Sequence, residues 1–165
     1  MSEIYLAGGC FWGLEEYFSR INGVTKTTVG YANGTTEATD YQQVHTTDHA
    51  ETVHVTYDEA VISLTDILRY YFRVIDPLSI NKQGNDVGRQ YRTGIYYSVD
   101  TDLPVINKAV AHQRQKLGTE LAVEIEPLRN YILAEDYHQD YLKKNPGGYC
   151  HIDVNKARQP LTPEE

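Results

Sequence analysis

The sequence predicts an α+β fold, a two-layer α/β sandwich with helices packed on a mixed, mostly antiparallel sheet related to the ferredoxin-like arrangement. Segments with helical spacing and segments with alternating apolar residues are mixed along the chain, and their connections are too irregular for a doubly wound sheet. The chain has 165 residues, of which 41% are hydrophobic, so it is long enough to bury a real core. No internal repeat, linker or low-complexity tract divides it. We therefore expect residues 1–165 to form a single domain.

Five segments have the composition of strands, and they cover residues 4–7, 24–32, 52–57, 93–98 and 121–125. The third is the clearest, because Val53, Val55 and Tyr57 fall on one face of an extended chain. Two aperiodic stretches, residues 33–40 and 79–92, are rich in turn-forming residues. Long loops of this kind in compact domains are often functional.

Apolar residues at helical spacing predict four helices, over residues 11–21, 64–75, 103–117 and 134–144. Ser63 has capping-box spacing before the second helix, Asp102 is the expected N-cap of the third, and Gly118 is its expected end. From about residue 146, a Pro-Gly-Gly sequence ends the last helix and begins an irregular, flexible C-terminal tail.

The segment with the most distinctive chemistry lies between the first strand and the first helix and reads Gly8-Gly9-Cys10-Phe11-Trp12-Gly13. We expect Cys10 at the helix N-terminus, where free backbone N–H groups and the helix dipole favour an anion and so stabilise a thiolate. A nucleophilic sulfur beside two aromatic rings suits a small apolar or sulfur-bearing group. The alternative is that Cys10 is a small buried hydrophobe and the rings are core, but an ordinary core segment has no need of the flanking glycines.

The overall charge excludes one broad class of function. The formal net charge is −8 and the isoelectric point is near 5.2, which argues against nucleic-acid binding. No apolar run approaches membrane-spanning length and no basic leader precedes the first strand, so we expect a cytoplasmic protein without membrane contact. The two cysteines, Cys10 and Cys150, lie near opposite ends of the chain. A disulfide between them is expected to be transient and catalytic, because stable structural disulfides are unusual in the cytoplasm.

Three further segments carry candidate functional groups, and each alone also has a simple structural explanation. His49-Ala50-Glu51 lies at the entrance to the third strand, and taken by itself it is explained as a solvated charged group before a strand. Residues 86–91 are explained alone by a turn built from neighbouring glycines and an asparagine. Cys150 in the tail is explained alone by an incidental exposed thiol.

Taken together, these segments resemble the A-type peptide methionine sulfoxide reductases, the family that reduces the S epimer of methionine sulfoxide. The resemblance runs from Leu6 to about Cys150. Its motifs, in order, are the Gly-Cys-Phe-Trp-Gly segment at residues 9–13, Gly30-Tyr31-Ala32-Asn33-Gly34, Tyr41, His49-Ala50-Glu51, residues 84–92, His138-Gln139-Asp140-Tyr141 and residues 144–150. Asn33 stands where the family usually has glycine, but asparagine tolerates the left-handed conformation that the turn requires. No cysteine follows Cys150, which leaves a single resolving thiol.

The resemblance implies a thiol mechanism in two steps. Cys10 is the nucleophile that attacks the sulfoxide sulfur, and Glu51 is the general acid, which must be neutral to protonate the oxygen. Cys10 is left as a sulfenic acid, Cys150 condenses with it to form a disulfide, and thioredoxin, or dithiothreitol in vitro, restores the dithiol. No cofactor or metal is implied. The implied activity is the repair of free and protein-bound methionine-S-sulfoxide by a single catalytic domain whose tail carries the resolving cysteine.

The same resemblance implies a substrate site. Tyr41 and Tyr91 hydrogen-bond the sulfoxide oxygen, and Asp86 helps to place the substrate. Phe11 and Trp12 form the apolar pocket for the S-methyl group. The catalytic set is Cys10, Tyr41, Glu51, Asp86, Tyr91 and Cys150, and the substrate-binding set is Phe11, Trp12, Tyr41, Glu51, Asp86 and Tyr91.

Two other functions remain open from the residues alone. A cysteine hydrolase would pair Cys10 with His49 or His54 as the base, and Asp86 would orient that base. This explains neither the paired tyrosines nor the second cysteine. A zinc-binding module would use both cysteines and the histidines, but the cysteines do not fall in close pairs and a histidine directly adjoins the second one.

Overall fold

A computed structural model describes all residues, 1–165. Its main element is a six-stranded sheet with the strand order β7-β6-β1-β3-β2-β8. The strands are β1 (Ser2–Ala7), β2 (Val24–Ala32), β3 (Ala50–Tyr57), β6 (Thr93–Tyr97), β7 (Val123–Pro127) and β8 (Ile132–Leu133). All neighbouring strands are antiparallel except β6 and β7, which run parallel. The predicted mixed, mostly antiparallel sheet is therefore confirmed.

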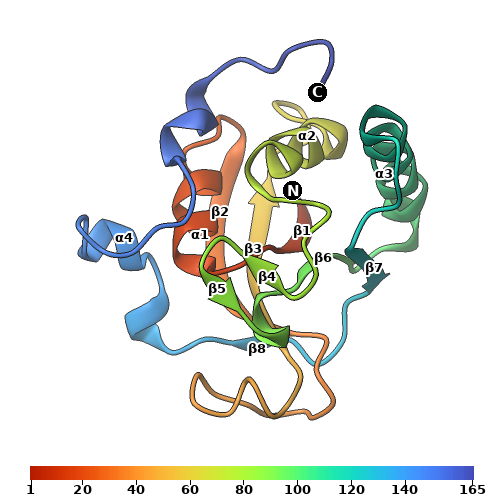
Figure 1. The fold of residues 1–165 in the computed structure, drawn as a ribbon. Helices are drawn as coiled ribbons and strands as arrows, with labels where there is room; N and C mark the ends of the chain where they lie inside the picture. Colours follow the sequence, from red (N-terminus) through yellow and green to blue (C-terminus); the bar gives the residue numbers. More distant parts are fainter.

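The three long helices pack on one face of this sheet (Figure 1). They are α1 (Phe11–Ser19), α2 (Leu64–Val74) and α3 (Leu103–Leu117). Alternate strand residues point toward them, so that Ile4 and Leu6 of β1 lie in one buried cluster with Phe18 of α1. Each fully buried side chain of this size contributes about 1.5–3 kcal/mol of hydrophobic free energy, which holds the two layers together. None of the helices is long and apolar enough to cross a membrane.

The opposite face of the sheet carries a smaller apolar cluster, formed by Tyr5, Ala7, Ala32, Ala50 and Tyr96. Leu128 and Tyr131, from the segment between β7 and β8, pack against this cluster. Gly30 leaves room for this segment, because a Cβ at that position would lie 2.5 Å from Cζ of Tyr131. The second face is thus covered by an extended segment instead of a helical layer.

The helix ends test the predicted capping residues. The Ser63 hydroxyl accepts the Asp66 N–H at 3.1 Å, as a capping side chain does. Gly118 has a φ of +70° and ends α3, as predicted. Asp102 occupies the N-cap position of α3, as predicted, but its side chain makes no capping hydrogen bond, because a 3-10 turn over Asp100–Asp102 leads directly into the helix.

The stretch over residues 79–92 contains a short hairpin that the sequence pattern did not indicate. Its strands are β4 (Lys82–Gln83) and β5 (Asp86–Val87). Gln83 anchors the hairpin, because its buried side-chain amide donates to the Asp76 carbonyl at 2.8 Å and to the Thr93 hydroxyl at 3.0 Å. The hairpin is too short to show a periodic pattern in the sequence. Its position depends instead on the hydrogen bonds of the buried Gln83 with residues outside the hairpin.

Residues 134–144 do not form the single helix that was predicted. A 3-10 turn over Asp136–His138 is followed by the four-residue helix α4 (Tyr141–Lys144). Asp140, between them, has a φ of +51°, which an α-helix does not accommodate. Gln139 explains the break, because its side chain hydrogen-bonds both the N–H and the carbonyl of β2 residue Val29, at 2.9 and 2.8 Å.

The chain after residue 146 is irregular, as predicted, and returns over α1 toward α2 (Figure 1). A short 3-10 turn over Val154–Arg158 packs on α1. Arg73 of α2 holds the residues that follow, since its guanidinium donates to three backbone carbonyls of the tail and pairs with the Glu165 carboxylate at 2.6 Å. The tail is therefore fixed to the helical layer beyond the segment that carries the second cysteine.

Tyr71 of α2 ties the helical layer to the end of β1. The ring is fully buried, and its hydroxyl lies 2.6 Å from the Ala7 carbonyl and 3.2 Å from the Gly94 carbonyl of β6. Ala7 is the last residue of β1, directly before the two glycines and Cys10. One hydroxyl thus fixes the point at which the chain leaves the sheet.

We predict that Tyr71→Phe lowers the free energy of unfolding by about 1–3 kcal/mol, because the buried carbonyl of Ala7 loses its donor. Urea denaturation monitored by circular dichroism measures the change. The matched control is Tyr137→Phe, whose ring is 55% exposed and which should change stability by no more than about 0.5 kcal/mol. Equal, small effects of the two substitutions would contradict the anchoring role.

Candidate active site

The turn before Cys10 consists of positions that accept only glycine. Gly9 has a φ of +81°, and a Cβ there would lie 2.6 Å from the Cβ of Gln83. A Cβ on Gly8 would lie 2.6 Å from Cγ2 of Ile75, at the end of α2. The turn is therefore packed tightly between α2 and the β4–β5 hairpin, and it holds the cysteine in one place.

Cys10 is the N-cap residue of α1, and its side chain is buried. Burial raises the pKa of the Cys10 thiol well above its ordinary value, and the neighbouring Glu51 carboxyl adds to the effect. The backbone N–H of Trp12 favours the thiolate, as a helix N-terminus should, but the effect is smaller. The expectation of a thiolate stabilised by the helix N-terminus is therefore wrong for the resting protein, because burial outweighs one N–H group.

Glu51 at the start of β3 is a second buried ionisable group. Its side chain is 2% exposed and accepts the Phe11 N–H at 3.2 Å. The pKa of Glu51 is raised to about 8, because burial and, to a smaller extent, the charge of Asp86 raise it more than the Phe11 N–H lowers it. A carboxyl with this pKa is mainly neutral at neutral pH. The alternative of a solvated charge before a strand is therefore excluded.

Tyr41 and Tyr91 approach Cys10 and Glu51 from two different loops. Tyr41 lies in the loop between β2 and β3, and Tyr91 ends a 3-10 turn that follows the β4–β5 hairpin. Burial, and then the charge of Glu51, raise the pKa of both hydroxyls, with smaller effects from Cys10 and Asp86. Both tyrosines therefore remain hydroxyl donors. The structure brings these five predicted residues close enough for their charges to act on one another.

The Tyr41 loop is held by Glu135, a residue that the sequence did not single out. One carboxylate oxygen of Glu135 accepts the Tyr31 hydroxyl at 2.8 Å, and the other accepts the Tyr41 N–H at 3.1 Å. The Tyr41 ring also lies 4.5 Å from the ring of His138. Although 38% of Tyr41 is exposed, its backbone and ring are both fixed.

Phe11 and Trp12 differ in their surroundings. Phe11 is 1% exposed and packs on Tyr31 with ring centroids 5.7 Å apart, so it belongs to the core. Trp12 is half-buried, its indole N–H donates to Nδ1 of His138 at 2.9 Å, and its ring stacks on Tyr141 at 3.7 Å. Trp12 is therefore held at its edge and on one face, in a fixed orientation beside the thiol.

The tail covers the start of α1. The Cys150 sulfur lies 2.7 Å from the position that a Cβ on Gly13 would occupy, so only glycine leaves room for it. The Cys150 thiol donates to the Ile152 carbonyl at 3.0 Å, and both cysteines are free. The Tyr149 hydroxyl donates to the Asp86 carboxylate at 2.9 Å. The tail thus lies between the α1 face and the Asp86 side of the site.

The residues around the site that received no role from the sequence are Glu135, His138, Tyr141, Tyr149 and His151. The available signal was a concentration of aromatic, histidine and carboxylate side chains after the last strand. The helix expected over residues 134–144 concealed it, because that helix would place Tyr137 and Tyr141 one turn apart. In the structure Tyr141 stacks on Trp12 while Tyr137 is exposed.

The histidines considered as catalytic bases have other partners. Both ring nitrogens of the buried His49 are engaged, one with the Thr47 hydroxyl at 2.9 Å and the other with the Asn130 carbonyl at 3.2 Å. His54 pairs with Glu3 at 2.7 Å. No group of three or more histidine, cysteine, aspartate or glutamate side chains is arranged to hold a metal ion. Neither His49 nor His54 is therefore free to act as the base of a cysteine hydrolase.

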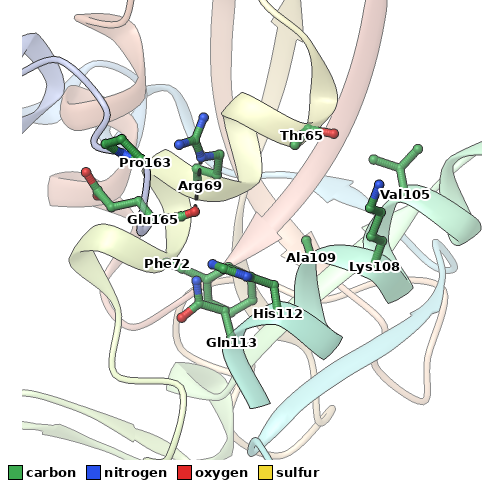
Figure 2. A pocket seen from close by; sticks show the side chains of 10 residues that line it. All are labelled: Thr65, Arg69, Phe72, Val105, Lys108, Ala109, His112, Gln113, Pro163 and Glu165. Carbon is green, nitrogen blue, oxygen red and sulfur yellow. Dashed lines mark hydrogen bonds between the residues drawn. The ribbon is translucent and has the colours of Figure 1, made fainter. Parts of the chain in front are cut away.

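A cavity of about 260 Å³ opens between α2 and α3 (Figure 2). Its lining includes Arg69, Phe72, Lys108, His112 and Glu165. Arg69 donates to a main-chain oxygen of Glu165 at 3.1 Å, so the cavity lies where the C-terminal residues pack. It contains none of the predicted site residues and takes no part in the thiol site.

Solved structures provide an independent comparison. The reduced form of Mxr1 from Saccharomyces cerevisiae is 39% identical, with a TM-score of 0.85 over 91% of this chain and 88% of that chain. Methionine sulfoxide reductase A of Corynebacterium diphtheriae is 36% identical, with a TM-score of 0.85 over 90% of this chain and 76% of that chain. Mxr1 in complex with Trx2 is 29% identical, with a TM-score of 0.61 over 85% of this chain and 84% of that chain.

The family comparison covers nearly the whole chain. The model of the family described as peptide methionine sulfoxide reductase matches residues 2–165. The match includes the glycine turn, the buried carboxyl and the tail, and it agrees with the fold of the solved relatives. The chain therefore belongs to the peptide methionine sulfoxide reductase family.

Proposed function

We propose that this family member is a methionine-S-sulfoxide reductase, a thiol-dependent oxidoreductase that returns free and protein-bound methionine-S-sulfoxide to methionine and so repairs oxidised proteins. The observation that carries the proposal is the neutral carboxyl of Glu51 beside the Cys10 thiol and two tyrosine hydroxyls. A sulfoxide oxygen is a poor leaving group until it is protonated. The site offers both the proton and a sulfur nucleophile, which is what this reduction requires.

In the first half of the proposed cycle, oxygen moves from the substrate to the enzyme. Glu51 protonates the sulfoxide oxygen while the hydroxyls of Tyr41 and Tyr91 donate to it, and Asp86 helps to place the substrate. The Cys10 sulfur attacks the sulfoxide sulfur and gives up its thiol proton, which replaces the proton that Glu51 has donated. The S–O bond of the substrate then breaks, the hydroxyl group passes to the Cys10 sulfur as the transient S–S bond breaks, and methionine leaves with Cys10 oxidised to a sulfenic acid. The raised pKa of Glu51 supports its role as the acid, since a carboxyl with an ordinary pKa would hold no proton at neutral pH.

Epimer selection follows from the fixed aromatic wall. Trp12 forms the accessible wall of the pocket for the S-methyl group, Phe11 contributes from the core, and the contacts of Trp12 with His138 and Tyr141 hold that wall in place. Inversion at sulfur exchanges the oxygen and the lone pair. Only one epimer can therefore direct its oxygen to Glu51 while its methyl group lies in the pocket.

In the second half of the proposed cycle, Cys150 condenses with the Cys10 sulfenic acid to give a disulfide and water. The position of the Cys150 sulfur on the face of α1, against Gly13, supports this role. Thioredoxin then reduces the disulfide by exchange, and dithiothreitol can replace it in vitro. The structure of the relative Mxr1 in complex with Trx2 supports a thioredoxin partner. The cycle uses no cofactor.

The proposal treats residues 1–165 as one catalytic domain, with an irregular tail from about residue 146 that carries the resolving cysteine and whose motion is limited to the loop between its two attachments. It also places the enzyme in the cytoplasm.

The direct test of the function is methionine formation from each purified epimer with dithiothreitol as reductant. We expect the S epimer to react at least about 100-fold faster than the R epimer, because only its oxygen meets the hydrogen-bond donors. Comparable rates for the two epimers would contradict the proposal.

The general acid is tested by Glu51→Gln. We expect methionine formation in a single turnover to slow by about 10²–10⁴-fold, because the amide can hydrogen-bond the oxygen but cannot deliver a proton. The wild-type rate should fall as pH rises through about 8, where Glu51 loses its proton, and this decline should be absent in the variant. Glu37→Gln, at an exposed loop position, is the matched control and should keep the wild-type profile. A wild-type rate for Glu51→Gln at neutral pH would remove Glu51 from the mechanism.

The resolving thiol is tested by Cys150→Ser. Without reductant, this variant should release about one methionine per enzyme and then stop as the Cys10 sulfenic acid, because no other cysteine remains to condense with it. Thioredoxin should support little further turnover, whereas dithiothreitol should restore it by attacking the sulfenic acid directly. Methionine release is measured first alone and then with each reductant. Cycling with thioredoxin at the wild-type rate would show that Cys150 is not the resolving thiol.

A further inference from the structure

The imidazole of His151 lies across the turn that carries Cys10. A Cβ on Gly9 would lie 2.9 Å from Nε2 of this ring, and a Cβ on Gly13 would lie 3.7 Å from Nδ1. The two glycines flank Cys10, one directly before it and the other three residues after it. The ring therefore spans the place where the two sulfurs of the proposed disulfide have to meet.

The hydrogen bonds of His151 define its tautomer. Nε2 lies 3.2 Å from the Gly8 carbonyl oxygen, which can only accept, so Nε2 carries the hydrogen. Nδ1 then carries the free lone pair of the neutral ring. This nitrogen is buried and has no hydrogen-bond partner. Buried acceptors are nearly always paired, so an unpaired one beside two thiols indicates a chemical role.

Cys150 rests in a form that has to lose a proton before it can attack. Its thiol donates to the Ile152 carbonyl at 3.0 Å, and burial raises its pKa above the ordinary value. The Cys150 sulfur lies 2.7 Å, and Nδ1 of His151 3.7 Å, from the same point, the Cβ position of Gly13. Rotation of the thiol away from Ile152 therefore turns its proton toward a nearby free lone pair.

We propose that His151 is the general base for the Cys150 thiol in disulfide formation, a role that rests on the function proposed above. Nδ1 takes the thiol proton, the Cys150 sulfur attacks the Cys10 sulfur, and the S–O bond of the sulfenic acid breaks. The leaving hydroxide takes the proton from the imidazolium and departs as water. The Cys150 sulfur is oxidised and the Cys10 sulfur is reduced, so no further reductant or oxidant enters the step.

The surroundings of His151 keep the ring neutral at neutral pH. Burial lowers its pKa below the ordinary value, while the charge of Asp86 and the hydrogen bond to the Gly8 carbonyl oppose this. The Cys150 thiol lies on the α1 side of the ring, beside the Cβ position of Gly13. The other charged groups near it line an adjoining cavity and are Arg73, Asp76, Asp153 and Lys156. They carry two charges of each sign.

The experiment uses two substitutions that separate a base from a structural contact. His151→Gln keeps an N–H that can donate to the Gly8 carbonyl but has no basic nitrogen, whereas His151→Ala loses both. His45→Gln, an exposed histidine of the loop between β2 and β3, is the matched control. The full-length enzyme is mixed once with methionine-S-sulfoxide without reductant. Methionine and disulfide are then quantified over time at several pH values, and dimedone traps any sulfenic acid.

We expect His151→Gln to slow disulfide formation by about 10²-fold, the lower end of the range for a general base, and to slow methionine formation far less. Dimedone-trapped Cys10 sulfenic acid should accumulate. The wild-type rate of disulfide formation should fall at low pH as His151 becomes protonated, whereas the rate of His151→Gln should rise with pH throughout. His45→Gln should match the wild type.

Three results would overturn the proposal. The first is disulfide formation at the wild-type rate in both His151→Gln and His151→Ala. The second is a normal rate in His151→Gln combined with a slow rate in His151→Ala, which would reduce His151 to a contact that docks the tail. The third is a pH profile of His151→Gln that levels off with the same midpoint as that of the wild type, which would assign the titrating group to another residue. A wild-type enzyme that releases no methionine at all would overturn the proposed function itself and this inference with it.

Discussion

A neutral carboxyl group in the protein interior is the constraint on which the site depends. Glu51 receives a hydrogen bond from the Phe11 N–H, and that N–H is available because Phe11 begins α1 and has no partner within the helix. The start of β3 and the start of α1 must therefore lie side by side, and the glycine turn before Cys10 allows the chain to place them so. If Glu51 were solvated, it would ionise, and its charge would raise the pKa of the neighbouring thiol still further. The burial that keeps the acid neutral also keeps the resting thiol protonated, so both groups retain their protons.

The segment between β8 and α4 organises the rest of the site without being a helix or a strand. Gln139 bonds β2 through its side-chain amide, much as a backbone peptide group would, and this fixes the segment along the sheet edge. From that position Glu135 holds the Tyr41 loop and His138 holds the Trp12 indole. One short stretch of chain thus positions two parts of the proposed substrate site. These are the Tyr41 hydroxyl, for the sulfoxide oxygen, and the Trp12 ring, for the methyl group.

Features decided by neighbours in sequence could be predicted, and those decided by distant contacts could not. Gly118 ends α3 and Asn33 adopts a φ of +57°, both as expected, because these conformations depend on the residue itself. Residues 134–144 have helical spacing, yet the bonds of Gln139 to a strand more than a hundred positions away override it. The pKa of Cys10 follows the same rule, because its burial comes from elements that the local pattern does not reveal. The family motifs predicted the candidate reactive groups, while the residues that hold those groups emerged only from the fold.

The tail is attached to the protein on both sides of Cys150, and this has a kinetic consequence for the proposed cycle. On one side Gly148 packs closely against Tyr141, where a Cβ would lie 2.9 Å from the ring, and on the other Arg73 binds the residues that follow. A thiol on a short, doubly tethered loop samples little space, so its effective concentration at its target reaches the millimolar range or higher. Small thiols in solution must compete with that local concentration for the Cys10 sulfenic acid. The internal disulfide, and not a mixed disulfide with a small thiol, is therefore the species that the recycling partner should encounter.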